Sequence, residues 1–97
     1  MLTVDTIRHT LRPLQDELRD TYGIERLYLF GSYAKHQATP HSDIDILVDF
    51  EKTPDLLTFL QLEELLSKTL QAPVDLVPKR KLKERLKQTI LNEAIAL

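Results

Sequence analysis

The stretch Leu27–Phe50, LYLFGSYAKHQATPHSDIDILVDF, combines a glycine-serine pair with regularly spaced aspartates. Successive side chains of a β-strand point to opposite faces of the sheet, so strict alternation of residue type predicts a strand. Four apolar residues would share one face, and three aspartates and a leucine the other: Ile44, Ile46, Val48 and Phe50 against Asp43, Asp45, Leu47 and Asp49. The second half of the stretch therefore predicts a strand with one apolar and one acidic face.

Asp43 and Asp45 stand two residues apart on this strand. Side chains at that spacing emerge on the same face, about 6–7 Å apart. Two carboxylates this close repel each other unless a cation lies between them, and hard oxygen ligands favour Mg²⁺, which takes further oxygens from substrate phosphates. Alternatively, Asp43 to Asp49 could simply be the solvated face of an edge strand. If Asp43 and Asp45 are metal ligands, Asp49 is expected to be an ordinary surface acid.

Asp75 lies in the apolar stretch PVDLVP, which predicts a short strand over residues 72–78 bounded by Pro73 and Pro78. An unpaired charge in the middle of such a strand is unusual and costly. A third carboxylate beside Asp43 and Asp45 would complete a site for two metal ions, one polarising a phosphate and the other lowering the pKa of an attacking hydroxyl. It could also serve as the general base.

Gly31 and Ser32 stand where the predicted strand IERLYLF ends at Phe30 and a short helical turn could begin. Glycine lets the backbone approach a bulky anion, and the amides of such a turn with the Ser32 hydroxyl would hold a phosphate. A lone Gly-Ser is more often only a turn, and the P-loop pattern is absent from the chain. Ser42 could contact a phosphate or cap the entry to the next strand.

Helices are predicted on both sides of these strands. The first runs from residue 4 to about 21, with Thr3 as its cap, a kink at Pro13 and a stop at Gly23. A second, capped by Thr53 with Pro54 at its first position, would bury one stripe of side chains: Leu56, Phe59, Leu60, Leu66 and Leu70. A last helix follows from about Lys79. The fold class is α/β, a single domain over residues 1–97 with a small mixed sheet flanked by helices.

Composition excludes several classes of protein. The chain has no cysteine, which removes disulfide scaffolds, cysteine-rich zinc sites and thiol nucleophiles. Charges interrupt the apolar positions of the N-terminus, so neither a signal peptide nor a membrane span is expected there, and the default location is the cytoplasm. The basic run from Lys79 to Lys87 lacks interleaved aromatic residues in a chain of net charge −2, so it reads as a solvated helix face and no direct nucleic-acid binding is expected.

Three other side chains near the acids carry weaker signals. His36 and His41 flank the loop before Asp43, and a zinc site could be imagined there, although exposed loop histidines are more often bystanders. Tyr33 either packs in the core or contacts a nucleotide.

Gly-Ser, nine residues, Ser-Asp-x-Asp and a third acid thirty residues beyond Asp45 form a specific combination. It resembles the nucleotidyltransferase superfamily with the DNA polymerase beta-like palm, and the short length is similar to its minimal nucleotidyltransferase (MNT) branch. The resemblance implies a palm-like core in which Gly31 and Ser32 hold the nucleotide triphosphate. It also implies that Asp43 and Asp45 bind Mg²⁺ and that Asp75 is the third catalytic and metal-binding acid.

The family often carries an Arg-Gly pair shortly after the Gly-Ser, and the matching positions here are Lys35 and His36. Lys35 could still contact a nucleotide phosphate as a point charge, without the bidentate fork of arginine. His36, which has a side chain, stands at the position where the family often has glycine.

Free-standing MNT proteins of this size are similar to the antitoxin halves of HEPN/MNT toxin–antitoxin pairs. The resemblance implies Mg²⁺-dependent transfer of AMP from ATP to a hydroxyl, expected to be a tyrosine, of a HEPN ribonuclease toxin within a hetero-oligomer. A chain of 97 residues has no room for a lobe that encloses a small acceptor, which also favours a macromolecular acceptor. The alternative is a catalytically weak or inactive antitoxin that neutralises its partner by direct binding. The base preference, the acceptor residue and the number of AMP units remain open.

Overall fold

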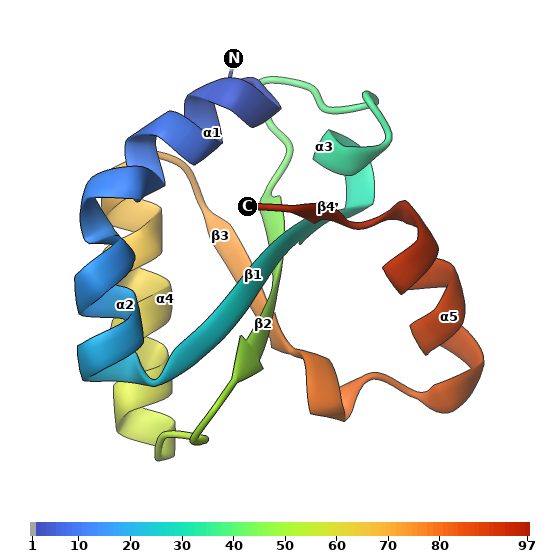
Figure 1. Cartoon of the computed structure of the whole chain (residues 1–97). Helices are drawn as coiled ribbons and strands as arrows, with labels where there is room; N and C mark the ends of the chain where they lie inside the picture. The colour runs from blue at the N-terminus through green and yellow to red at the C-terminus, as the bar shows by residue number, and fades with distance from the viewer. Residues whose placement is uncertain (1) are drawn as a thin grey trace.

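A four-stranded mixed sheet with the strand order β3-β2-β1-β4 forms the centre of the computed structural model, which describes residues 2–97 (Figure 1). Strand β1 (Ile24–Phe30) pairs antiparallel with β2 (Ile44–Phe50), and β2 pairs parallel with β3 (Val74–Pro78). On its other side β1 pairs antiparallel with β4 (Ile95–Ala96). The acidic strand β2 is therefore an interior strand, and the edge-strand interpretation of its aspartates is wrong.

Helices α1 (Val4–Leu11), α2 (Gln15–Tyr22) and α4 (Leu56–Leu70) lie on one side of the sheet, and α5 (Glu84–Glu93) lies on the other (Figure 1). The first three supply buried leucines and an isoleucine that pack against the inward face of the strands. This core contains Ile7, Leu11, Leu18, Ile24, Leu29, Tyr33, Ile44, Ile46, Val48, Leu62, Leu66, Leu70, Val74 and Leu76. Within residues 2–97, no helix is both long enough and apolar enough to span a membrane.

The N-terminal helical region is confirmed with its cap and its kink. The Thr3 hydroxyl accepts a hydrogen bond from the Thr6 amide at 3.1 Å. A 3₁₀ turn at Arg12–Leu14 contains Pro13 and separates α1 from α2, because proline has no amide hydrogen to continue an α-helix. Helix α2 ends at Gly23, whose φ of +68° lies in the left-handed region that glycine adopts without strain.

Helix α4 differs from its prediction in cap and in buried face. Its cap is Asp55, whose carboxylate accepts a hydrogen bond from the Thr58 amide at 2.8 Å, and Thr53 lies outside the helix. Leu62 is fully buried, whereas Leu60 is 50% exposed. Each residue turns a helix by about 100°, which rotates Leu60 by about 120° from the centre of the face set by Leu62, Leu66 and Leu70. Leu56, 73% exposed, also lies outside the buried stripe.

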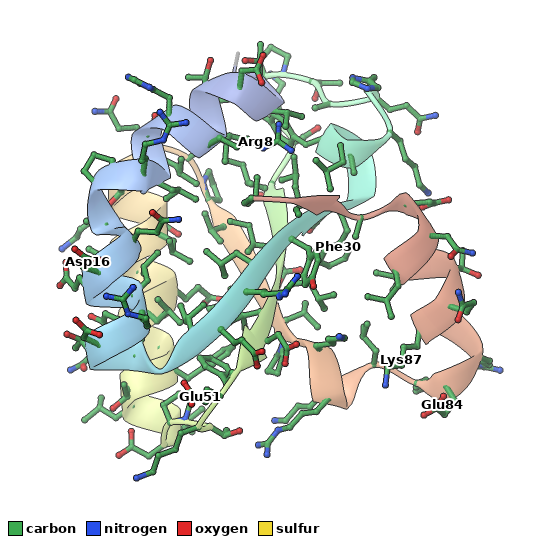
Figure 2. The ribbon with its side chains drawn as sticks, viewed as in Figure 1. Arg8, Asp16, Phe30, Glu51, Glu84 and Lys87 are labelled. Atoms are coloured by element: carbon green, nitrogen blue, oxygen red, sulfur yellow. The ribbon has the colours of Figure 1, made fainter. Side chains whose placement is uncertain are left out.

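The predicted last helix is wrong at both ends. A 3₁₀ turn at Lys79–Lys81 precedes α5, and the chain after α5 becomes the short strand β4 beside Tyr28 and Leu29. The Arg8 guanidinium donates to the Ala96 carbonyl oxygen at 2.8 and 3.2 Å and holds this strand in place (Figure 2). Apolar residues continue at helical spacing through this segment, so periodicity alone gave no sign of the strand.

The two faces of α4 should respond differently to truncation. We expect Leu62→Ala to lower the free energy of unfolding by about 2–4 kcal/mol, because it removes fully buried methyl groups and leaves a cavity. Leu60→Ala on the same helix should change it by less than about 0.5 kcal/mol. Urea unfolding followed by circular dichroism measures both. Equal effects of the two substitutions would contradict the burial assignment.

Candidate active site

Strand register brings the predicted acids to one place. Asp45, the second residue of β2, lies opposite Asp75 of β3 on one side and opposite Phe30 of β1 on the other. Neighbouring strands are about 4.8 Å apart, and directly paired residues project from the same face of the sheet. Asp43 immediately precedes β2, and its charge also acts on Asp45. The start of β2 and the loop end before it therefore bring Asp43 and Asp45 together with Asp75 at the start of β3, thirty residues farther along the chain.

Gly31, the first residue of the short helix α3 (Gly31–Ala34), faces this cluster. A Cβ at this position would lie 3.0 Å from Cγ and 3.2 Å from Cβ of Asp45, and would collide with the carboxylate oxygen Oδ2. The backbone φ of +70° independently favours glycine. The Asp45 carboxylate thus lies directly against a bare Cα, and Gly31 is required both by its conformation and by the space that the acid occupies.

The environment of Asp45 disfavours its negative charge. Burial raises the pKa of Asp45 above its ordinary value, and the nearby charges of Asp75 and Asp43 raise it further. A divalent cation would relieve this repulsion, and a set of carboxylate oxygens suits Mg²⁺. Among residues 2–97, no three candidate ligands are gathered tightly enough to enclose an ion. Asp43 and Asp75 are exposed, so their side chains have room to turn toward a cation.

Apolar side chains follow the aspartates along the same face of β2. Leu47 points to the same face as the aspartates but is fully buried, because it lies between Tyr28 and Val77 of the neighbouring strands. Beyond it, the Asp49 carboxylate pairs with Lys79 Nζ at 3.5 Å, and this Nζ lies 6.0 Å from the centre of the Tyr28 ring. Asp49 is therefore a half-buried ion-pair partner, and the paired residues Tyr28, Leu47 and Val77 separate it from the cluster. Lys79, which belongs to the basic run, thus has a structural contact.

Lys35 points toward α5 in this structure. Its Nζ lies 3.4 Å from Oε2 of Glu93, and both side chains are roughly half exposed, at 47% and 42%. The pair links the end of α3 to α5. Contact of Lys35 with a nucleotide phosphate stays a prediction, because it would require this ammonium to exchange or share its partner.

His36 takes the left-handed conformation expected of the family's glycine. Its φ is +58°, and two hydrogen bonds close the end of α3, from Gln37 N to Ser32 O at 2.8 Å and from His36 N to Tyr33 O at 3.4 Å. This bonding pattern is the helix ending at which glycine is favoured. A side chain in this conformation costs about 1–2 kcal/mol, so the loop keeps the geometry at some expense of stability.

The remaining predicted residues have structural contacts. The Ser42 hydroxyl accepts a hydrogen bond from the Thr39 amide at 2.8 Å, which fixes the loop that leads into β2. Tyr33 is buried in the core, in agreement with the packing interpretation. His36 and His41 are exposed, and neither belongs to a group of three candidate metal ligands in residues 2–97.

Sequence reasoning missed two contacts of predicted site residues, namely Phe30 beside Asp45 and Glu93 beside Lys35. The long connection between β1 and β2 does not fix their register, and no sequence spacing links Lys35 to Glu93. Only the fold could identify these contacts.

The family model described as a nucleotidyltransferase domain matches residues 11–97 of this chain. The chain belongs to the nucleotidyltransferase family. A protein adenylyltransferase, MntA, from Thermococcus cleftensis is 44% identical to this nucleotidyltransferase over 95 residues, which cover 98% of this chain and 96% of the relative. The family resemblance inferred from the Gly-Ser and aspartate spacing is confirmed.

Solved structures share the fold of this nucleotidyltransferase. A protein described provisionally as a minimal nucleotidyltransferase superposes with a TM-score of 0.83 at 35% identity, over 99% of this chain and 97% of the other. A toxin–antitoxin crystal structure with AMP-PNP gives 0.69 at 30% identity, over 82% of this chain and 66% of the other. A Shewanella oneidensis complex of tri-AMPylated HEPN toxin with MNT antitoxin gives 0.66 at 28% identity, over 93% and 70%.

The repulsion of Asp45 by Asp75 and Asp43 in this nucleotidyltransferase should affect its stability. Because the folded-state pKa of Asp45 is raised, the folded protein should lose stability as the pH rises from the ordinary aspartate pKa through the raised value. Asp45→Asn removes the charge, so without added divalent cations it should be more stable than the wild type at pH 7. The gain should not exceed about 1 kcal/mol, since solvent screens the charges.

Urea unfolding at a series of pH values measures this difference. The two proteins should converge at a pH below the ordinary aspartate pKa, where Asp45 is protonated in both states. Asp49→Asn is the matched control and should bring no stabilisation, because Asp49 has a cationic partner in Lys79. A variant less stable than the wild type at pH 7, with an unchanged pH dependence, would contradict the repulsion.

Proposed function

We propose that this nucleotidyltransferase transfers AMP from ATP to a tyrosine hydroxyl of a HEPN ribonuclease toxin and thereby acts as its antitoxin. The observation that carries the proposal is the cluster of Asp43, Asp45 and Asp75, in which the Asp45 carboxylate lies against the bare Cα of Gly31. The relative named protein adenylyltransferase and the solved complex of an AMPylated HEPN toxin with an MNT antitoxin support the nature of the reaction and of the partner.

The acids suit the binding of a nucleotide with its metal ions. Asp43, Asp45 and Asp75 would hold Mg²⁺, which when bound supplies positive charge to the phosphates and lowers the pKa of the attacking hydroxyl. Ser32 and the backbone at the start of α3 would contact the triphosphate, because these groups lie beside Asp45 at the end of β1. Ser42 would keep the loop before Asp43 in place.

The transfer itself is an in-line displacement. The acceptor oxygen forms a bond to the α-phosphorus of ATP while the bond from that phosphorus to the oxygen that bridges to the β-phosphate breaks. Pyrophosphate leaves with the electron pair of the broken bond, and AMP remains joined to the acceptor as a phosphodiester. Asp75 is exposed beside Asp45, where its carboxylate can accept the hydroxyl proton as a general base.

The second candidate function is neutralisation by binding alone, with little or no transfer. The specific observation in its favour is the ion pair of Lys35 with Glu93. This pair holds the Lys35 ammonium beside Glu93, whereas the first function would use that ammonium on a phosphate of the nucleotide. Under this alternative the MNT fold covers its partner without chemistry.

The two functions predict different results when the purified protein is incubated with the HEPN-type product of a neighbouring gene, α-labelled ATP and Mg²⁺. We expect the label to enter the partner. Asp43→Asn and Asp45→Asn should each reduce the initial rate of labelling by at least about a hundredfold, because each removes a carboxylate that would hold Mg²⁺ at the reacting phosphate. Asp49→Asn, outside the cluster, should label at the wild-type rate.

Substitution of the accepting tyrosine of the partner by phenylalanine should also abolish labelling. A wild-type protein that transfers nothing but still blocks the ribonuclease would reject the enzymatic proposal in favour of direct binding. A protein that neither labels nor blocks the partner would reject both.

A further inference from the structure

The outer edge of β3 is covered by side chains of α4. Strand β3 is an edge of the sheet, so only one of its sides pairs with another strand. On its free side, the Val74 amide donates to the Ser67 hydroxyl at 3.1 Å, and the Leu76 amide donates to Oε2 of Glu63 at 3.1 Å. These amides flank Asp75, whose own partner across the sheet is Asp45.

The spacing of the two contacts follows from the geometry of a helix beside a strand (Figure 1). Glu63 and Ser67 are four residues apart, which advances about 6.0 Å along a helix axis. Val74 and Leu76 are two residues apart, which advances about 6.6 Å along a strand. The Ser67 carbonyl oxygen also accepts from the Ala72 amide at 3.2 Å, a bond that closes the end of α4 just before β3 begins.

Because this side of the strand has no further strand beside it, these contacts supply partners that its partly buried amides would otherwise lack. Val74 and Leu76 are themselves buried, whereas Glu63 and Ser67 are half-buried. Leaving a buried backbone amide without an acceptor is unfavourable, so the strand would shift or open at that point. A shift of β3 would move Asp75 relative to Asp45.

We propose that Glu63 and Ser67 are positioning residues of the nucleotidyltransferase reaction, which hold β3 in the register that places Asp75 opposite Asp45. The inference rests on the proposed function for its effect on rate, but the contacts themselves do not. Neither side chain touches the reacting groups. They act through the amides of Val74 and Leu76, which flank Asp75, on the side of the strand away from β2.

The rate of transfer should depend on the acceptor at position 63 and not on its charge. Glu63→Ala should lower kcat by about tenfold to a hundredfold with little change in the KM for ATP, because a displacement of about 1 Å in a reacting group costs about that much. Glu63→Gln keeps an acceptor oxygen and should restore most of kcat. Ser67→Ala, which removes one hydroxyl and keeps the helix intact, should lower kcat in the same direction and serves if Glu63→Ala is poorly folded.

Glu64 supplies a matched control on the same helix. Its carboxylate pairs with Lys68 at 3.1 Å on the solvent side, so Glu64→Ala should leave kcat at the wild-type value. A general weakening of α4 would affect both positions, whereas the proposed role affects only position 63.

Amide hydrogen exchange and cross-strand nuclear Overhauser effects in the free protein test the contacts without any reaction. Glu63→Ala should accelerate exchange at Leu76 and weaken the contacts between Asp75 and β2, and Glu63→Gln should do neither. Unchanged exchange in Glu63→Ala, or faster exchange with an unchanged kcat, would overturn the proposal. If the wild type transfers no AMP, the proposed function fails by itself, and the exchange and Overhauser measurements still decide whether Glu63 holds the register.

Discussion

The pairing of β2 with both β1 and β3 is the constraint on which the rest of the site depends. It places Asp45 opposite Asp75 and sets its carboxylate against the bare Cα of Gly31 at the end of β1. Since side chains of a strand alternate between faces, a one-residue slip of β2 against β1 would direct Asp45 into the apolar core, and a one-residue slip of β3 against β2 would do the same to Asp75. The apolar face of β2, buried against α1, α2 and α4, makes such a slip costly, so the hydrophobic core also fixes the position of the acids.

The site concentrates negative charge where the fold can support it. Burial and two neighbouring carboxylates raise the pKa of Asp45, and a fully buried Leu47 lies beneath the acids. The third acid, Asp75, lies on β3, and α4 contacts the free edge of this strand through Glu63 and Ser67. The arrangement costs stability in the absence of a cation, as expected of a site formed for binding and chemistry rather than for folding.

The sequence predicted most of this arrangement because the decisive signals were local. Alternation identified β2, Pro13 identified the break in the first helix, and an acid within the apolar stretch of β3 identified Asp75. The failures involve interactions between distant segments. Helical spacing predicts Leu60 in the core, because no local signal sets the rotation of α4 about its axis. It also predicts helix across β4, because the hydrogen bonds of that strand come from β1. The contact of Lys35 with Glu93 likewise depends on how α5 returns to α3.

The central claim is that Asp43, Asp45 and Asp75 form one divalent-cation site facing Gly31. Titration of the ¹⁵N-labelled protein with Mn²⁺ tests it most directly, because paramagnetic broadening of amide signals falls steeply with distance from the ion. We expect the first signals to broaden to be those of Gly31, Ser32, the residues from 43 to 45, and Asp75, and this selectivity to disappear in Asp45→Asn. Broadening that begins instead at the exposed acids of α2, Asp16 and Asp20, or that is unaffected by Asp45→Asn, would contradict the claim.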